Sequence, residues 1–394
     1  MSAAAFAVAV AAFAAWPYLI LGRGGFWRGR EHDGALLPPG EDALAEWPRV
    51  VAIIPARDEA DCVGTTIGSL LRQDYQGRFA IILVDDGSAD GTAEAARGAA
   101  TAAGAADRLT IITGTDLPPG WTGKLWAMRQ GVVEAERGPE PPDFLLFSDA
   151  DIAYAPGVLR RLVAGATARG TVLTSLMVKL RCESAAERLL IPAFVFFFQK
   201  LYPFAFVNDP GRRIAAAAGG CMLVRRAALA DAGGLEALRG ALIDDCALGA
   251  LMKRHGPIWL GLTKDAESLR AYPGIGDIRR MVARSAYAEL DYSPARLAGA
   301  VAGMILVYLT PPLLTVFATG AAQALGAAAW ALMALAYWPT LRLYRLNALW
   351  GLALPAIAAI YTAFTVDSAV QHWQGRGGAW KGRVQGHVSR SAFR

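Results

Sequence analysis

The stretch "FLLFSDADIAY" at residues 144–154 decides the fold and raises the main chemical question. Its apolar run, Phe144 to Phe147, is typical of a buried strand. The run leads directly into Asp149 and Asp151, which are separated by one alanine. Like charges this close disfavour ionisation unless a positive charge lies nearby. We therefore expect either a solvated loop or a place that holds a cation.

Similar apolar runs occur upstream of this stretch. They are "VVAIIP" (50–55), "FAIILV" (79–84) and "LTIIT" (109–113), and a segment of helical character follows each of them. Buried strands separated by helices predict a parallel sheet that is covered by helices on both faces. We expect this α/β region to extend from about residue 49 to residue 290.

Polar clusters follow three of the predicted strands: "PARDEA" (55–60), "DDGSADGT" (85–92) and "SDAD" (148–151). Ligands of such sheets bind outside the carboxyl ends of the strands, so the clusters should converge on one crevice. Mg²⁺ and Mn²⁺ usually join one or two carboxylates to substrate phosphates. A D-x-D pair is common by chance, whereas three ordered clusters are more specific. The second cluster also suits a turn before an N-capped helix.

The N-terminal segment is apolar enough to cross a membrane. Residues 3–21 carry no charge, and their length spans a bilayer as a helix. Arg23, Arg28 and Arg30 follow at once. The positive-inside rule therefore places the residues from 22 onward in the cytoplasm.

The C-terminal third contains further candidate membrane segments. No charged residue occurs between Arg296 and Arg342, which leaves room for two crossings, and a third apolar run follows Arg345. Buried core helices are the alternative. Four crossings would place residues 371–394 outside, yet that tail has five basic residues and no acidic one. One segment is therefore predicted to be re-entrant or interfacial.

Composition narrows the function classes. The 394-residue chain is 54% hydrophobic with a mean hydropathy of +0.32, and its net charge is +5. In a membrane protein, this excess of basic residues indicates contact with anionic lipid headgroups. We expect no nucleic-acid partner. The four cysteines form no C-x-x-C pair, which argues against structural zinc and suits a reducing compartment.

The motifs resemble those of a known enzyme family. "VVAIIPARDEA", "ILVDDGSADGT", "FLLFSDAD" and "LIDDCALG" (242–249) resemble the family 2 glycosyltransferases with a GT-A fold. "LPPGWTGKLWAM" (117–128), "GGCMLVRR" (219–226) and "GAWKGR" (378–383) resemble the hopanoid-biosynthesis-associated branch, which is related to membrane ceramide-glucosyltransferase-like enzymes. The resemblance implies a transmembrane anchor (1–22), a GT-A domain (45–290), two to three membrane helices (296–370) and a basic tail (371–394).

The resemblance also implies where the nucleotide sugar binds. Pro55, Arg57 and Glu59 would shape a uridine pocket, and Asp86 would read the uracil or ribose edge with support from Asp85. Asp58 receives less weight, because the family often has Asn there. Lys124 before a helix could meet a diphosphate, although a surface lysine is the alternative. The complete predicted set is Pro55, Arg57, Glu59, Asp85, Asp86, Lys124, Asp149, Asp244 and Arg284.

The catalytic roles follow from the same resemblance. Asp151 would bind Mg²⁺ or Mn²⁺, and Asp149 would contact the ribose or assist the metal. The metal would neutralise the departing nucleoside diphosphate. Asp245 matches the catalytic base, and Asp244 stands where a Glu is common. A positioned carboxylate base typically contributes about 10²–10⁴-fold. Acids are also favoured at a helix start by the helix dipole alone.

The chain departs from the family at one motif. Many relatives carry Q-x-x-R-W, and the comparable stretch here is "RRMVARSAY" (279–287). Arg284 could match the Arg, but Met281 and Ser285 replace the Gln and the Trp. The absence of this Trp, which stacks on an acceptor sugar in processive synthases, favours transfer of a single sugar.

These observations predict a multi-pass protein of the inner (cytoplasmic) membrane whose catalytic domain faces the cytoplasm. It would be an inverting glycosyltransferase that moves one sugar from a nucleotide sugar, with a UDP-linked donor expected, to a lipid hydroxyl. A role in hopanoid or glycolipid biosynthesis is implied by the resemblance alone. The aromatic segment 189–207 would lie in the interface and admit the lipid, with core packing as the alternative. Rival interpretations are a processive polysaccharide synthase, a silent nucleotide-sugar- or lipid-binding scaffold, and a nucleotidyltransferase. The sequence does not indicate an oligomeric state.

Overall fold

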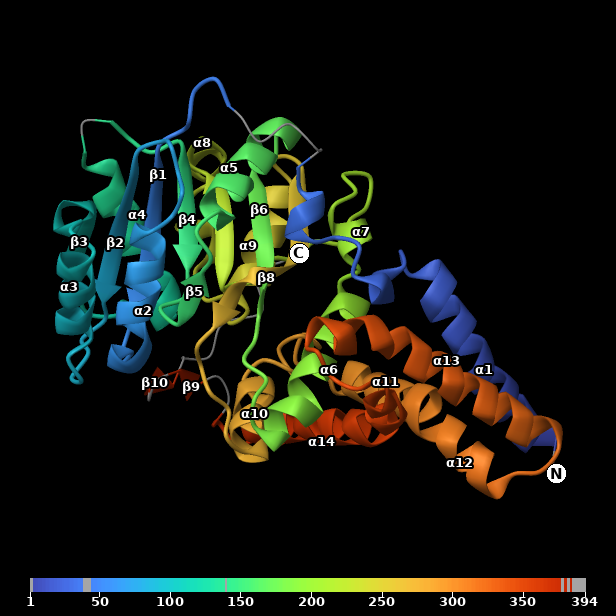
Figure 1. The fold of residues 1–394 in the computed structure, drawn as a ribbon. Coiled ribbons are helices and arrows are strands. Elements are labelled where there is room, and N and C mark those ends of the chain that lie inside the picture. The colour runs from blue at the N-terminus through green and yellow to red at the C-terminus, as the bar shows by residue number, and fades with distance from the viewer. Residues whose placement is uncertain (1–2, 38–43, 139, 377–378, 381–382, 385–394) are drawn as a thin grey trace. The chain divides into compact units, whose positions relative to one another are not determined.

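The computed structural model describes residues 3–37, 44–138, 140–376, 379–380 and 383–384 (Figure 1). The chain divides into two compact units. We call one the sheet unit, which comprises Glu31–Leu180, Phe206–Arg270 and Ala379–Arg394. The other, the helical unit, comprises Met1–Arg30, Arg181–Ala205 and Ala271–Gly378. Each unit is described by itself below.

The sheet unit is built on an eight-stranded sheet with the strand order β3-β2-β1-β4-β7-β6-β8-β5. β1 to β4 form a parallel group, and β6 runs parallel to β8, whereas β7 is antiparallel to β4 and β6. The predicted α/β, mostly parallel fold is therefore confirmed. The strands are β1 (Val50–Ala56), β2 (Phe79–Asp85), β3 (Leu109–Thr113), β4 (Phe144–Ser148), β5 (Ile152–Tyr154), β6 (Leu173–Lys179), β7 (Cys221–Arg225) and β8 (Ile258–Ser268).

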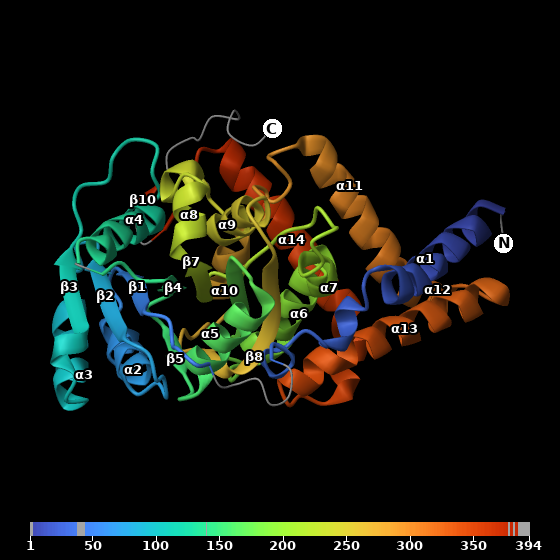
Figure 2. The same cartoon turned by 90° about the horizontal axis from the view of Figure 1, so that it is seen from above.

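Helices cover both faces of this sheet, as the alternation of side chains along a strand requires. Val50, Ala52 and Ile54 of β1 belong to one buried cluster with residues of α2 (Ala60–Leu71), α3 (Thr92–Ala102) and α5 (Val158–Arg169). The intervening Ile53 faces α4 (Gly123–Glu136). Figure 2 shows α4, α8 (Arg226–Asp231) and α9 (Asp244–Lys253) on one side of the strands and α2, α3 and α5 on the other.

A glycine sets how closely α4 approaches the sheet. A Cβ atom added to Gly131 would lie only 2.4 Å from Cγ2 of Ile53 and 3.2 Å from Cγ2 of Val84. Real Cβ atoms do not approach carbon that closely, so α4 can lie at this distance only with glycine here. Because Lys124 is the second residue of α4, this packing also positions its side chain.

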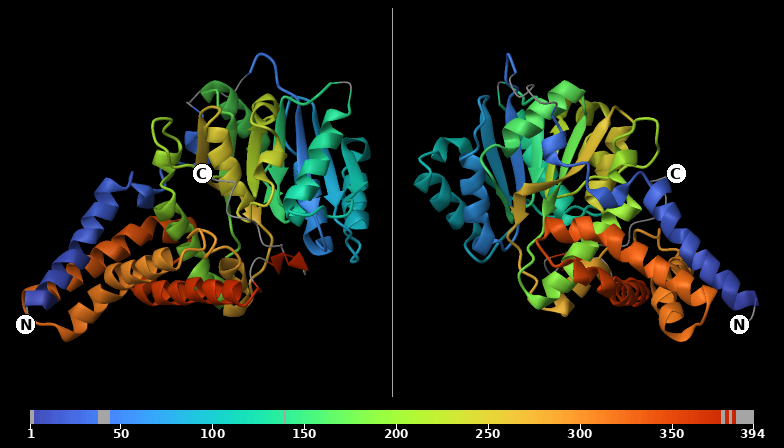
Figure 3. Two further views of the ribbon diagram at one scale, coloured as in Figure 1. Left: turned by 180° about the vertical axis from the view of Figure 1, so that it is seen from behind. Right: turned by 45° about the vertical axis from the view of Figure 1, so that its right-hand side comes forward.

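The helical unit contains most of the long apolar helices. Its α-helices are α1 (Ala3–Gly22), α6 (Ala185–Leu201), α10 (Ile275–Ala283), α11 (Pro294–Met304), α12 (Thr310–Phe317), α13 (Ala321–Leu343) and α14 (Leu354–Trp373). α1 lies beside α13 (Figure 3). Among the described residues, five segments are long and apolar enough to cross a membrane: Ala5–Gly22, Ala185–Val207, Pro294–Phe317, Ala321–Leu343 and Ala348–Trp373. Most of the predicted basic tail, 371–394, lies outside the described residues.

Strand pairing restricts one of these five segments. α6 lies in the sequence between β6 and β7, and these two strands are hydrogen-bonded neighbours. The chain must therefore enter and leave α6 on the same side of any membrane, because both strands belong to one sheet. A single complete crossing by Ala185–Val207 is excluded, which leaves an in-plane or re-entrant position or packing in the core. Much of α6 is buried, including Ile191 and Phe196, so the interfacial position of segment 189–207 stays a prediction.

We predict that Gly131→Ala destabilises the sheet unit by about 1–3 kcal/mol, because the new methyl group must displace Ile53 or move α4. The measurement is the thermal unfolding midpoint of the purified protein. The matched control is Gly98→Ala on α3, where an added Cβ would meet nothing within 4 Å. That change should leave the midpoint unchanged or raise it. Equal midpoints for the two variants would contradict the packing argument.

Candidate active site

The polar clusters after β1 and β2 are neighbours in space. Ala56, the last residue of β1, pairs with Asp85, the last residue of β2. The side chain of Asp85 accepts a hydrogen bond from the amide of Ser88 at 2.8 Å and so shapes the turn after β2. Pro55 is buried within β1, one residue before its end. The predicted convergence at the carboxyl edge of the sheet thus holds for these two loops.

Arg57 and Asp86 form the first charged contact at this edge. Nη1 of Arg57 lies 3.7 Å from Oδ2 of Asp86, a carboxylate that is only 3% exposed. Asp58 adopts a left-handed backbone conformation with φ of 50°, which Asp and Asn tolerate better than most residues. Its backbone amide donates to Ser88 Oγ at 3.0 Å, and its carboxylate accepts from the Ala89 amide at 3.0 Å. Asp58 therefore links the two loops, a role that sequence reasoning underestimated.

Lys124 joins carboxylates from two further elements. Its Nζ atom lies 2.8 Å from Oδ1 of Asp149, in the turn after β4, and 3.3 Å from Oδ2 of Asp244, the first residue of α9. The lysine side chain is only 19% exposed, so Lys124 is not an ordinary surface lysine. Burial alone would lower the pKa of Lys124, but the two carboxylates outweigh it and raise this pKa. The ammonium group therefore stays charged.

Asp245 lies beside this lysine, and the pKa of its carboxyl group is raised. Its carboxylate accepts hydrogen bonds from the backbone amides of Gly219 at 3.0 Å and Cys246 at 2.7 Å. Burial, followed by the neighbouring charge of Asp244, raises the pKa of Asp245 to about 6, although Lys124 opposes the shift. A carboxyl group with such a pKa is a good general base near neutral pH.

Gly219 makes the close approach of these groups possible. A Cβ atom on this residue would lie 3.2 Å from Nζ of Lys124 and 3.3 Å from Oδ2 of Asp245. Any side chain would therefore crowd both charged groups. The glycine lies at the start of the "GGCMLVRR" stretch, just before β7.

Arg270 is a site residue that sequence reasoning missed. Its Nε atom lies 2.8 Å from Oδ2 of Asp151, and its Nη2 atom lies 2.5 Å from Oε1 of Glu59. Asp151 and Glu59 are 8% and 11% exposed, so the guanidinium neutralises two largely buried carboxylates. Its position after a strand could have indicated it. Arg270 follows the carboxyl end of β8, which runs parallel to β6 and therefore to β4, so it lies at the same edge of the sheet as Asp149 and Asp151.

Arg284 is the one predicted residue outside this group. It is exposed, stands at the C-cap of α10 and belongs to the helical unit, whereas the other predicted site residues lie in the sheet unit. Its predicted contact with a diphosphate stays a prediction.

The donor set fits a divalent cation in charge and chemistry. Within the described part of the chain, the ion pairs and charge contacts given above join five carboxylates to two cations, Lys124 and Arg270. Oδ2 of Asp244 is buried, and it accepts no hydrogen bond beyond its ion pair with Lys124. Among the described residues, no three His, Cys, Asp or Glu side chains form a ready-made metal site. A metal held by Asp149 and Asp151 would therefore complete its shell with substrate phosphates and water, as Mg²⁺ commonly does.

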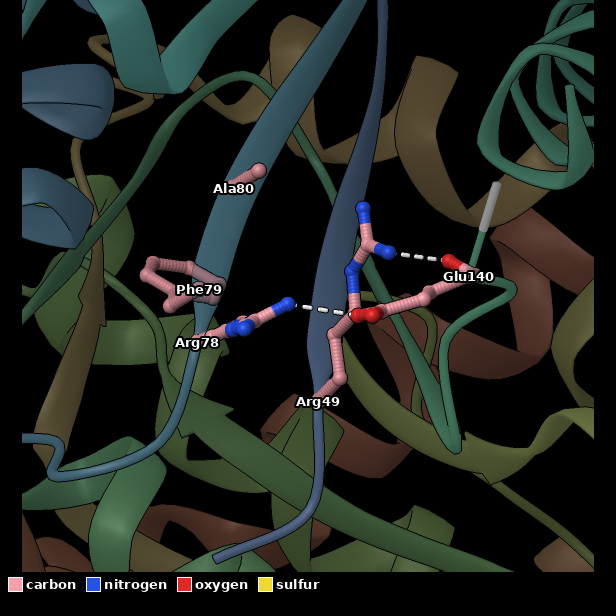
Figure 4. Close-up of a pocket in the computed structure, with 5 residues that line it drawn as sticks. All are labelled: Arg49, Arg78, Phe79, Ala80 and Glu140. Atoms are coloured by element: carbon pink, nitrogen blue, oxygen red, sulfur yellow. Dashed lines mark hydrogen bonds and ion pairs between the residues drawn. The ribbon is translucent and has the colours of Figure 1, made fainter. Parts of the chain in front are cut away.

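A hollow at the other edge of the sheet is a separate feature. A pocket of about 290 Å³ lies where β1 and β2 begin and is lined by Arg49, Arg78, Phe79, Ala80 and Glu140 (Figure 4). Arg78 and Glu140 form an ion pair whose side chains are 76% and 62% exposed. Exposed pairs contribute little stability, and the pocket contains none of the predicted site residues.

Comparison with solved structures finds several that are similar to this chain. The mannosyltransferase PcManGT from Pyrobaculum calidifontis, in complex with GDP-Man and Mn²⁺, aligns with a TM-score of 0.55 and 19% identity, covering 94% of this chain and 97% of that one. Mannosyl-3-phosphoglycerate synthase from Rubrobacter xylanophilus aligns with a TM-score of 0.40 and 20% identity, covering 68% and 81%. Glucosyl-3-phosphoglycerate synthase from Mycobacterium tuberculosis, in complex with Mn²⁺, UDP and glucosyl-3-phosphoglycerate, aligns with a TM-score of 0.39 and 17% identity. The alignment covers 61% of this chain and 80% of that one. A comparison with curated protein sequences gives no match.

The sheet order and the carboxylate-lined edge, together with the first of these likenesses, define a GT-A fold. The family model described as "Glycosyltransferase like family 2" matches residues 48–259, more than half of the chain. The chain belongs to this family and is a glycosyltransferase that uses a nucleotide sugar.

We predict that Arg270→Ala lowers the unfolding midpoint by an amount equivalent to about 1–3 kcal/mol, because Asp151 and Glu59 lose their shared cation. The loss should be smaller in Mn²⁺ than in EDTA, since a bound cation would take over the neutralisation. Thermal unfolding under both conditions tests this. The control is Arg97→Ala, which removes an exposed pair with Glu94. An equal loss with and without Mn²⁺ would show that Arg270 shares no carboxylate with the metal.

Proposed function

We propose that this protein is a membrane-bound inverting glycosyltransferase that transfers one sugar from a nucleotide sugar to the hydroxyl group of a lipid. The observation that carries the proposal is Asp245, a half-buried carboxyl group that lies near Lys124 and whose pKa is raised to about 6. The motif resemblance further supports a UDP-linked donor and a hopanoid-type or related glycolipid acceptor.

The donor would bind across the loops after β1, β2 and β4. Arg57 and Asp86 are held together at the base of these loops, where carboxylate and backbone groups can accept hydrogen bonds from a nucleobase and ribose. Asp58 keeps the two loops in register. Asp149 and Asp151 would hold Mg²⁺ or Mn²⁺, which supplies charge neutralisation for the departing diphosphate.

Asp245 would act as the general base. Direct displacement at the anomeric carbon inverts its configuration and requires the acceptor hydroxyl to lose its proton during attack. With a pKa of about 6, Asp245 is mostly ionised at pH 7 yet still basic enough to accept that proton. The amides of Gly219 and Cys246 fix the direction of its carboxylate.

Lys124 would position these groups. Its ammonium contacts Asp149 and Asp244 and lies beside Asp245, so it connects the donor-binding turn to the catalytic helix. When the donor binds, the same charge would be available to the diphosphate oxygens, which is the contact that the "GWTGK" motif predicts.

The apolar helices support a lipid acceptor. Five described segments are long and apolar enough for a membrane, and strand pairing excludes a single crossing by α6. A helix that lies in the interface gives a lipid hydroxyl a route to a water-exposed site. A soluble sugar acceptor would need no such helices.

Two rivals make different demands. A processive synthase would extend a polymer, and the missing Gln and Trp at Met281 and Ser285 speak against it. A silent scaffold would bind donor without turnover, and the intact set of Asp149, Asp151 and Asp245 speaks against that.

We predict a pH dependence for kcat/KM. The active form of Asp245 is the carboxylate, so the rate should rise with pH through about 6 and level off above about pH 7. Asp244→Asn removes the like charge that raises the pKa of Asp245, so the rising limb should move to lower pH. A limb that stays unchanged in this variant would contradict the assignment of the limb to Asp245.

The experiment that tests the function is nucleoside diphosphate release by the purified protein in detergent with Mn²⁺. A panel of UDP- and GDP-sugars would be assayed with and without hopanoid and sphingolipid acceptors. We expect acceptor-dependent release from one donor, reduced about 10²–10⁴-fold in Asp245→Asn. Asp107→Asn, at an exposed carboxylate, is the matched control and should retain full activity.

Product analysis separates the rivals. One sugar per lipid supports the proposal, whereas a ladder of longer products would identify a processive synthase. Metal-dependent donor binding without release for any acceptor would favour the scaffold.

A further inference from the structure

Two positive side chains meet in the helical unit, where α1 and α6 end. Arg23 is the first residue after α1, and Lys200 is the penultimate residue of α6. Nη2 of Arg23 donates hydrogen bonds to the backbone oxygens of Lys200 at 2.8 Å and Leu201 at 3.4 Å. Arg23 therefore caps the carboxyl end of α6, and this cap brings its charge close enough to repel that of Lys200.

The ammonium of Lys200 has unusual surroundings. Its Nζ atom donates to the hydroxyl of Tyr308 at 3.0 Å. It also lies 4.7 Å from the ring centre of Tyr308 and 5.2 Å from that of Phe197. Among the described residues, no carboxylate forms an ion pair with Arg23 or Lys200, whereas Lys124 and Arg270 of the sheet unit each have two. An ammonium has three N–H donors, so two remain available after the bond to Tyr308.

This arrangement costs free energy unless an anion completes it. Cations within membrane segments are expensive and usually pair with an opposite charge or face water. The carboxyl end of α6 carries a partial negative charge of about half an elementary charge, which favours a nearby cation. This partial charge is too small to balance two full positive charges. The ring faces stabilise the lysine ammonium but leave the net charge unchanged.

Apolar side chains lie on the same two helix ends. Tyr18 and Leu21 of α1 are 61% and 76% exposed, and Leu201 of α6 is 47% exposed. A ligand that combines an anionic head with apolar chains would contact both kinds of surface. A soluble anion would use the cations alone and leave these side chains uncovered.

We propose that Arg23 and Lys200 form a binding site for the phosphate of an anionic phospholipid from the surrounding membrane, with Tyr308 orienting the ammonium. Arg23 would contribute the donors that are not used in capping α6, and Lys200 its two remaining N–H groups. The acyl chains would lie against Leu21 and Leu201. The site does not depend on the proposed glycosyl transfer, because all of its residues belong to the helical unit.

The test measures binding and stability, so it is independent of activity. The unfolding midpoint of the full-length protein in neutral detergent would be recorded with short-chain phosphatidylglycerol, phosphatidylcholine or inorganic phosphate. Phosphatidylglycerol should raise the midpoint of the wild type by about 2–4 °C, and the neutral lipid and free phosphate should not. The shift should disappear in Lys200→Met and in Arg23→Gln. It should persist in Lys200→Arg.

Arg28→Gln is the matched control, because it removes one exposed arginine near the same helix end and lowers the net charge equally. It should keep the shift. If Lys200→Met fails to fold, Arg23→Gln and Lys200→Arg decide the question. A shift that survives in Arg23→Gln and Lys200→Met, or one lost equally in Arg28→Gln, would overturn the site. An equal shift with inorganic phosphate would assign it to a soluble anion instead.

Discussion

The ion pairs of Lys124 are the interaction on which the active site depends. Four carboxylates lie near one another at the carboxyl edge of the sheet: Asp149, Asp151, Asp244 and Asp245. Their mutual repulsion would separate the turn after β4 from the start of α9 if no cation lay between them. Lys124 supplies that charge from α4, whose distance from the sheet is set by a glycine at position 131. The close packing of α4 at Gly131 thus fixes where the Lys124 charge lies among the carboxylates.

A second cation performs the same task nearby. Arg270 neutralises Asp151 and Glu59, so the two aspartates of the D-x-D pair have separate partners. The cluster still carries more negative than positive charge, which suits a divalent cation that arrives with the substrate. Burial, followed by the neighbouring charge of Asp244, raises the pKa of Asp245 and makes it suitable as a base near neutral pH. Site geometry and acid–base chemistry therefore depend on the same group of carboxylates.

Strand order also constrains the relation of this protein to a membrane. α6 connects two strands that pair with each other, so it cannot be a simple crossing despite its apolar length. Hydropathy alone treats it like the other four candidate segments. The cations at the ends of α1 and α6, Arg23 and Lys200, are the groups for which we propose an anionic phospholipid as partner.

The sequence by itself determined the α/β class, the apolar membrane segments and the three polar clusters at strand ends, because periodicity and turn chemistry are local properties of the chain. It indicated Lys124 and Asp245 only through motif resemblance. The tertiary structure decided which charges pair: Lys124 with Asp149 and Asp244, and Arg270 with Asp151 and Glu59. It also decided that α6 returns to the side it came from. These contacts join residues far apart in the chain, and strand order brings them together, which no local pattern encodes.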